Sequence, residues 1–119
     1  MALATLGVVV LDCPDPGALA GFYAEVLGGT VEGEGDWVDL KVPGGPSLAF
    51  QGSPDFVAPR WPAPDHSQQF HLDLTVENLD AAEAGVLALG AKPLDAEDRS
   101  RGWRVYADPA GHPFCLCAC

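Results

Sequence analysis

Two stretches of the chain decide the fold: residues 37–51 read WVDLKVPGGPSLAFQ, and residues 103–117 read WRVYADPAGHPFCLC. In both, a proline followed by a glycine separates two runs that contain apolar and aromatic residues, which is typical of a tight turn between paired strands. At a constant offset of 66 positions, the matching residues are Trp37 and Trp103, Pro43 and Pro109, and Gly45 and Gly111. The sequence therefore predicts the same hairpin twice.

A strand and a helix are predicted in front of the first hairpin. The apolar run 6–11 favours a buried strand, Asp15 and Pro16 suit the N-cap and first position of a helix, and Gly28 suits its end. The expected buried stripe of this helix has helical spacing and consists of Leu19, Phe22, Tyr23, Val26 and Leu27.

The second half follows the same plan. Residues 71–76 alternate between polar and apolar side chains, as in a strand with one buried face. Asp80 with Glu83 fits a capping box, and Gly90 fits the helix end. The expected stripe is Ala82, Val86 and Leu89. We therefore predict an α+β fold of two tandem βαβββ modules.

The two modules are expected to form a single domain, because 119 residues suit one core. Module one spans 1–53, module two spans 70–119, and residues 54–69 between them contain four prolines. Proline at this density cannot join a central strand, so this segment is predicted to be an extended linker.

The charge balance excludes some partners. Six Lys and Arg against 17 Asp and Glu give a formal net charge of −11, which repels nucleic-acid phosphates and anionic lipid headgroups. No nucleic-acid or membrane partner is predicted. The apolar residues 1–11 lack a preceding basic residue and are too short to span a bilayer, so a cytoplasmic location is expected.

Three of the four cysteines, Cys115, Cys117 and Cys119, alternate along the last strand and would share one face. Their spacing lacks the C-x₂₋₄-C pairs of zinc sites. We therefore favour small apolar side chains lining a cavity over a soft-metal site.

Several motifs together suggest a family. They are Asp15, Phe22-Tyr23 and Leu27-Gly28 in the first half, the His-initiated strand 71–76, and the segment 108–114, which reads DPAGHPF. With these motifs, the chain resembles the vicinal oxygen chelate superfamily, which includes glyoxalase I, extradiol dioxygenases and bleomycin-resistance proteins. The resemblance implies a curved, incompletely closed mixed sheet around a cavity, with the helices outside, and a homodimer.

The resemblance also implies where a metal would bind. Catalytic members hold a divalent metal through one residue from the first and last strand of each module, usually His or Glu. The corresponding positions here are Leu6, Ala49, His71 and Cys115. Leu6 and Ala49 carry no donor atom, so we predict that the family metal, and with it any cofactor, is absent. A rebuilt set of His71, Asp73, Cys115 and Cys117 remains the alternative.

The remaining polar and aromatic residues predict a binding wall for a small aromatic or amphipathic molecule. The candidate ligand-binding residues are Trp37, Gln51, Trp61, His71, Asp73, Trp103, Tyr106, Cys115 and Cys117. His71 and Asp73 are also the candidate catalytic residues, since an imidazole beside a carboxylate can transfer protons. Arg99, Arg101 and Arg104 are expected to form weak surface ion pairs.

Three functions fit these residues. The favoured hypothesis is a glyoxalase/bleomycin-resistance-like protein that binds a small organic molecule without the family metal. The second is an enzyme: either a lyase, isomerase or dioxygenase with a rebuilt metal site, or a metal-free acid/base catalyst using His71 and Asp73. The third is a structural module whose cavity is filled by its own side chains.

Overall fold

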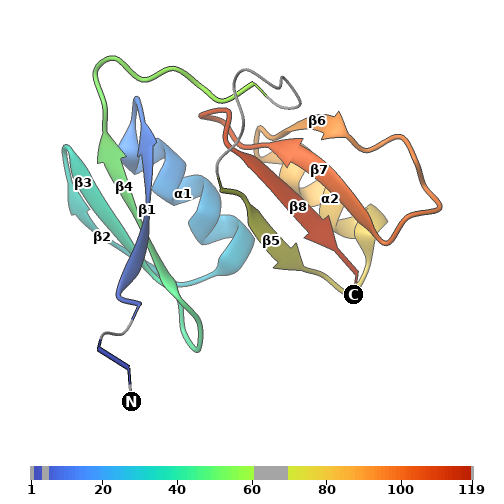
Figure 1. Cartoon of the computed structure of the whole chain (residues 1–119), viewed down its shortest axis with the longest axis horizontal. Coiled ribbons are helices and arrows are strands. Elements are labelled where there is room, and N and C mark those ends of the chain that lie inside the picture. Colours follow the sequence, from blue (N-terminus) through green and yellow to red (C-terminus); the bar gives the residue numbers. More distant parts are fainter. Residues whose placement is uncertain (1, 4–5, 61–69, 119) are drawn as a thin grey trace. The chain divides into compact units, whose positions relative to one another are not determined.

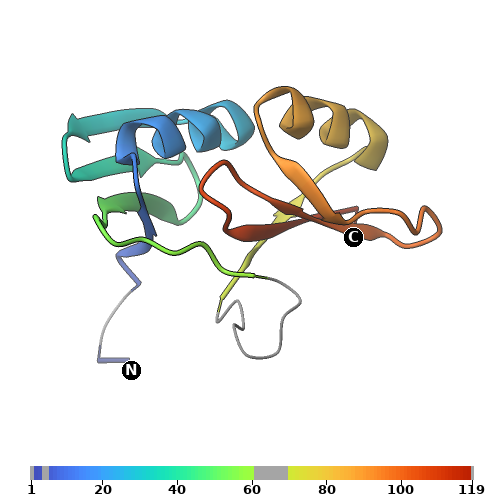
Figure 2. The same cartoon turned by 90° about the horizontal axis from the view of Figure 1, so that it is seen from above.

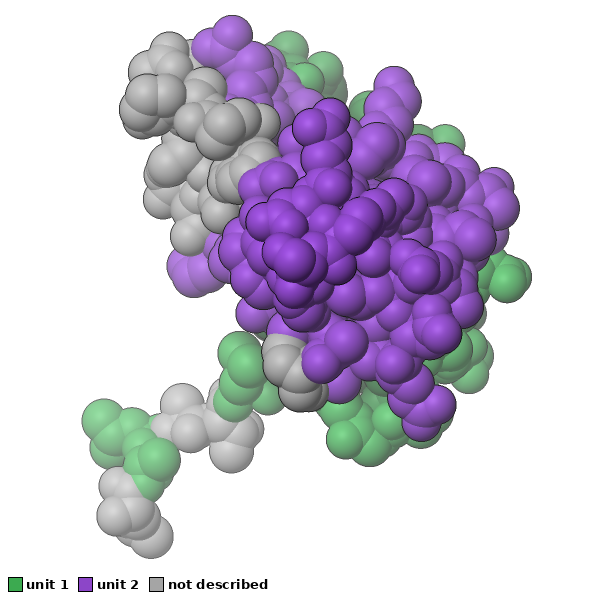
Figure 3. Space-filling model, turned by 90° about the vertical axis from the view of Figure 1, so that its right-hand side faces the viewer, with its two compact units in different colours: residues 1–56 green, residues 57–119 purple. Residues whose placement is uncertain are grey.

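The computed structural model describes residues 2–3, 6–60 and 70–118. The chain divides into two compact units, residues 1–56 and 57–119, and the boundary falls within the proline-rich segment 54–69 (Figure 3). Trp61 lies outside the described residues, so its expected role in ligand binding stays a prediction.

Both units have the same order of elements (Figure 1). Unit 1 consists of β1 (Val8–Cys13), α1 (Pro16–Leu27), β2 (Thr30–Glu34), β3 (Trp37–Lys41) and β4 (Ser47–Gly52). Unit 2 consists of β5 (Leu72–Thr75), α2 (Leu79–Ala88), β6 (Lys92–Asp95), β7 (Trp103–Ala107) and β8 (Pro113–Cys117). The prediction of two βαβββ modules and an α+β fold is confirmed.

The strands form two four-stranded mixed sheets rather than one closed barrel. The strand order is β1-β4-β3-β2 in unit 1 and β5-β8-β7-β6 in unit 2. The first strand of each unit pairs in parallel with the last, and the other pairs are antiparallel. Trp37 pairs with Gln51 as Trp103 pairs with Cys117, so the offset of 66 read from the sequence is also the offset between the two hairpins.

Each helix covers one face of its own sheet (Figure 2). Helix α1 begins and ends as predicted: the Asp15 side chain accepts a hydrogen bond from the Ala18 N–H, and Gly28 at the C-cap has a φ of 76°. Tyr23 of α1 stacks on Phe50 of β4 with ring centroids 5.8 Å apart. Both side chains are fully buried, so they anchor the helix to its sheet.

Helix α2 differs from the prediction at both its start and its stripe. Its N-cap is Asn78, whose side chain accepts a hydrogen bond from Ala81 N–H, so the capping box of Asp80 and Glu83 is wrong. Leu89 forms the C-cap and is 39% exposed, which leaves Val86 as the buried residue of the expected stripe. The two acidic side chains bind a cation of the sheet instead.

That cation is Arg104 of β7, which is 4% exposed. Its guanidinium lies 2.9 Å from Asp80 and 3.0 Å from Glu83. Glu83 also accepts hydrogen bonds from the Tyr106 hydroxyl at 2.7 Å and from Arg99 at 2.6 Å. The expectation that all three arginines are exposed is therefore wrong for Arg104, because burial of a guanidinium requires paired carboxylates and α2 supplies them.

The network also shifts the protonation equilibria of its members. The hydrogen bonds from Arg99 and then Tyr106 lower the pKa of Glu83 to about 2. Burial, followed by the hydrogen bond to Glu83, raises the pKa of Tyr106 to about 12. Glu83 is thus held ionised and Tyr106 protonated at neutral pH, and together they connect α2 to β7.

We expect Glu83→Gln to destabilise the fold at pH 7 by about 1–3 kcal/mol, because it removes one of the two carboxylates that balance the positive charge of the buried Arg104 guanidinium. The folded-state pKa of Glu83 lies below its ordinary value of 4.5, so its stabilisation is present above pH 4.5 and is lost as the pH falls towards 2. Urea unfolding as a function of pH measures the difference between the wild type and the variant, which should shrink over this range. Glu25→Gln, at an exposed position of α1, is the control. A difference that does not depend on pH would contradict this assignment.

Candidate functional site

The sheet of unit 2 has one face covered by α2 and an opposite face, which we call the open face. Arg104 and Tyr106 bind α2, so the alternate residues Trp103 and Val105 of β7 point to the open face. The pairing register adds the residues beside them on β5 and β8, namely Asp73, Thr75, Cys115 and Cys117.

Tyr106, expected to bind a ligand, lies on the other face. It is fully buried, its ring lies 5.8 Å from that of Phe114, and its hydroxyl donates to Glu83 of α2. The placement of Tyr106 in a binding wall with His71 is therefore wrong. Trp103 and Tyr106 are three positions apart on β7, so alternation of side chains places them on opposite faces of the sheet. The sequence alone could have shown this.

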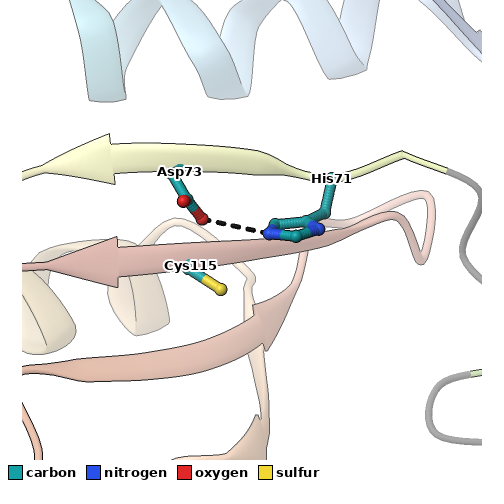
Figure 4. A group of neighbouring side chains, drawn as sticks. All are labelled: His71, Asp73 and Cys115. Atoms are coloured by element: carbon teal, nitrogen blue, oxygen red, sulfur yellow. Dashed lines mark ion pairs between the residues drawn. The ribbon is translucent and has the colours of Figure 1, made fainter.

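Three of the predicted site residues come together on the open face. His71 directly precedes β5, Asp73 is in β5, and Cys115 is the residue of β8 paired with Asp73 (Figure 4). His71 Nε2 lies 3.1 Å from Asp73 Oδ1. One ligand atom from each of the three side chains lies within 4.8 Å of the others, so nitrogen, oxygen and sulfur donors form one cluster.

The environment of Cys115 disfavours its thiolate. Burial first, and then the negative charge and hydrogen bonding of Asp73, raise the pKa of Cys115 to about 11. A cysteine that acts as a nucleophile needs the opposite shift. The cluster therefore does not form an activated cysteine nucleophile at neutral pH. Cys117, the fourth member of the rebuilt set, is disulfide-bonded and has no thiol to contribute.

A basic side chain borders the cluster. The Arg101 guanidinium lies 3.8 Å from the centre of the Trp103 ring and makes two hydrogen bonds with the Asp95 carboxylate at 3.0 and 3.1 Å. Trp103 is 42% exposed. Arg101 was expected only in a surface ion pair, and its stacking on Trp103 was not predicted. The only signal for it was an arginine two residues before a tryptophan.

Unit 1 has an equivalent open face with different chemistry. Trp37, also 42% exposed, donates from Nε1 to Asp39 at 3.3 Å, and Gln51 pairs with Trp37 on the neighbouring strand. Ala49, the residue equivalent to Cys115, is fully buried. The groups on this face that a ligand could contact are therefore the aromatic ring of Trp37 and the amide of Gln51.

The strand pairing corrects the residue of unit 1 that was expected to be equivalent to His71. Val9 pairs with Leu48 as Leu72 pairs with Phe114, so the residue equivalent to His71 is Val8. The assignment of Leu6 to this position is wrong by two residues, because it was counted back from Asp80, which is not the cap of α2. Leu6 lies before β1 and is 74% exposed.

The residues present do not fit the metal that the resemblance implies. That metal needs donors from both units, and the two positions of unit 1, Val8 and Ala49, end in hydrocarbon. A divalent cation requires nitrogen, oxygen or sulfur ligands, which these side chains cannot supply.

The fold agrees with comparisons to known proteins. The Glyoxalase-like domain family matches residues 8–117. A glyoxalase/bleomycin resistance protein/dioxygenase family enzyme from Burkholderia phytofirmans PsJN has a TM-score of 0.74 at 18% identity, with 95% of this chain and 97% of that chain covered. A glyoxalase family protein from Enterococcus faecalis has a TM-score of 0.68 at 26% identity, with 98% and 99% covered.

A third similar structure is TnmS3, an antibiotic binding protein from Streptomyces sp. CB03234, with a TM-score of 0.61 at 18% identity and coverage of 98% and 97%. A search of curated proteins gave no significant match. The chain belongs to the Glyoxalase-like domain family, within the vicinal oxygen chelate superfamily. Among the described residues, no helix is long and apolar enough to cross a membrane.

We expect Cys115 of the metal-free protein to react about tenfold more slowly with iodoacetamide at pH 8 than a free cysteine. Its raised pKa reduces the thiolate fraction, and the greater nucleophilicity of that thiolate offsets part of the loss. Asp73→Asn should increase the rate a few-fold because it removes a nearby negative charge. Peptide mass spectrometry after timed quenching measures the rate at Cys115 alone. Thr75→Ala, on the same face of β5, should leave it unchanged. A wild-type rate equal to that of free cysteine would contradict the raised pKa, and an unchanged rate in Asp73→Asn would show that Asp73 does not contribute to it.

Proposed function

We propose that the protein binds a small planar aromatic or amphipathic molecule on the open faces of its sheets, without the family metal. The observation that carries this proposal is the repeated tryptophan: Trp37 and Trp103 occupy equivalent positions in the two hairpins, and each is 42% exposed on the face opposite its helix. A large aromatic ring that is left partly exposed at the same place in both repeats suits stacking against a ligand.

Polar groups on the same faces would fix the ligand's orientation. Gln51 lies beside Trp37, and Asp73 and His71 are in the same face as Trp103. Arg101 covers one face of the Trp103 ring, so a ligand would use the remaining exposed surface or displace the guanidinium. The name of TnmS3, an antibiotic binding protein with a similar fold, supports binding of a small organic molecule. The homodimer implied by the family resemblance and the cytoplasmic location belong to the same proposal.

The second candidate is an enzyme on this scaffold that uses acid/base chemistry. The 3.1 Å contact between His71 Nε2 and Asp73 Oδ1 favours it, because a carboxylate at this distance can fix the orientation of an imidazole that transfers protons. Binding and proton transfer could share the same face. His71→Gln, which keeps a polar side chain of similar reach, separates the two functions.

We expect members of a panel of aromatic metabolites and antibiotics, bleomycin included, to raise the melting temperature in a concentration-dependent manner. For such a compound, Trp37→Ala and Trp103→Ala should each weaken binding about five- to tenfold, because each removes an aromatic contact worth about 1 kcal/mol. Titration followed by intrinsic fluorescence or calorimetry measures the affinity. Leu87→Ala, at an exposed position of α2, is the matched control. Unchanged affinity in both tryptophan variants would refute the proposal.

Each compound that binds is also incubated with the protein and analysed for products. If the second candidate is correct, a product forms with the wild type, and His71→Gln removes turnover while the dissociation constant changes little. If binding alone is the function, every compound is recovered intact. Loss of affinity without any product would place His71 in the binding wall only.

A further inference from the structure

We propose that unit 2 carries a metal site of its own, in which His71, Asp73 and Cys115 bind a borderline cation such as Zn²⁺. The set lies entirely within one unit and includes Asp73, which is not among the positions that the family resemblance implies. It requires nothing from Val8 or Ala49. The inference does not depend on the proposed binding of an aromatic ligand.

The separation of the donors is close to what one ion requires. Zn²⁺ binds nitrogen, oxygen and sulfur at about 2.0–2.3 Å, so neighbouring donors in a tetrahedral site lie about 3.3–3.8 Å apart. The His71 and Asp73 atoms are already 3.1 Å apart, and the three donors lie within 4.8 Å of one another. Closure therefore needs a movement of about 1 Å, which rotation of the side chains can supply.

The three positions differ in a way that favours such closure. Cys115 is half-buried in β8, which pairs with strands on both sides, so its backbone is a fixed anchor. The side chains of His71 and Asp73 are 38% and 67% exposed, and they can turn towards the sulfur without disturbing the core. The parallel register holds Asp73 directly opposite Cys115.

The surrounding charges allow a cation to approach. Arg101 is the basic group near Cys115, and its guanidinium is engaged by Asp95 through two carboxylate contacts and the backbone carbonyl at 2.8 Å. Asp73 contributes a negative charge at the cluster itself. The chain as a whole carries a formal net charge of −11, which attracts cations to its surface.

The chemistry of the donors selects the kind of metal. Mg²⁺ and Ca²⁺ prefer sites made only of oxygen, whereas imidazole and thiolate favour zinc and similar ions. Three protein ligands on an exposed face leave a fourth coordination position open, as in catalytic rather than structural zinc sites.

Titration with Co²⁺, a spectroscopic substitute for Zn²⁺, tests the site in the full chain. Under argon and without a thiol reductant, which preserves the disulfide of Cys117, we expect one Co²⁺ per chain and a near-ultraviolet absorption band from sulfur-to-cobalt charge transfer. Cys115→Ser should abolish this band. His71→Ala and Asp73→Ala should each weaken binding more than about tenfold. Zn²⁺ should displace Co²⁺.

The controls separate this site from other sources of binding. Thr75→Ala tests the neighbouring open-face position of β5, and Cys13→Ser tests the buried thiol of unit 1; neither should change the titration. Circular dichroism verifies that each variant is folded. In the wild type, Zn²⁺ should also protect Cys115 from alkylation, a readout that needs no substitution.

Any of these results would overturn the inference: no charge-transfer band, a band that survives in folded Cys115→Ser, or alkylation of Cys115 that Zn²⁺ does not slow. Binding that persists unchanged in both His71→Ala and Asp73→Ala would also do so, because the cation would then be held elsewhere. The proposed binding of an aromatic ligand is judged separately, by the tryptophan variants.

Discussion

The in-register parallel pairing of the first and last strands of each unit is the constraint on which the rest of the structure depends. It brings residues that are 42 positions apart in sequence, Asp73 and Cys115, directly opposite each other. Because side chains alternate along a strand, the same pairing fixes which residues face the helix and which lie on the open face. A slip by one residue would move Cys115 into the core and bring Leu116 onto the open face.

The two faces of the unit 2 sheet hold their polar side chains differently. On the helix side, Arg104, Glu83 and Tyr106 form a network that compensates a buried guanidinium and joins α2 to β7. On the open face, the side chains of His71 and Asp73 are more exposed and are not held by a buried network of this kind. Such groups can change partners when a ligand or an ion arrives, whereas breaking the buried network would leave charge uncompensated.

The two units share one fold but carry different chemical groups on it. Both hairpins present an exposed tryptophan at the same register position, but Val8 and Ala49 stand in unit 1 where His71 and Cys115 stand in unit 2. This asymmetry is incompatible with a metal shared between the two halves in the pattern of the family. It is compatible with an aromatic binding surface, and with a cation held by unit 2 alone.

The sequence by itself determined the two βαβββ modules, the caps and stacking face of α1, and the alternation that places His71 and Asp73 on one face, because these depend on short-range spacing and turn chemistry. The cap of α2 is equally local, because Asn78 accepts from the Ala81 N–H three residues on, and Asp80 was the wrong choice between two residues that can both cap a helix. Only the tertiary structure decided that Arg104 and Tyr106 are buried and that Val8 rather than Leu6 is equivalent to His71. Each of these depends on partners distant in the chain: Arg104 and Tyr106 of β7 bind the acidic side chains of α2, and strand pairing sets the register. Local sequence patterns cannot predict such long-range contacts.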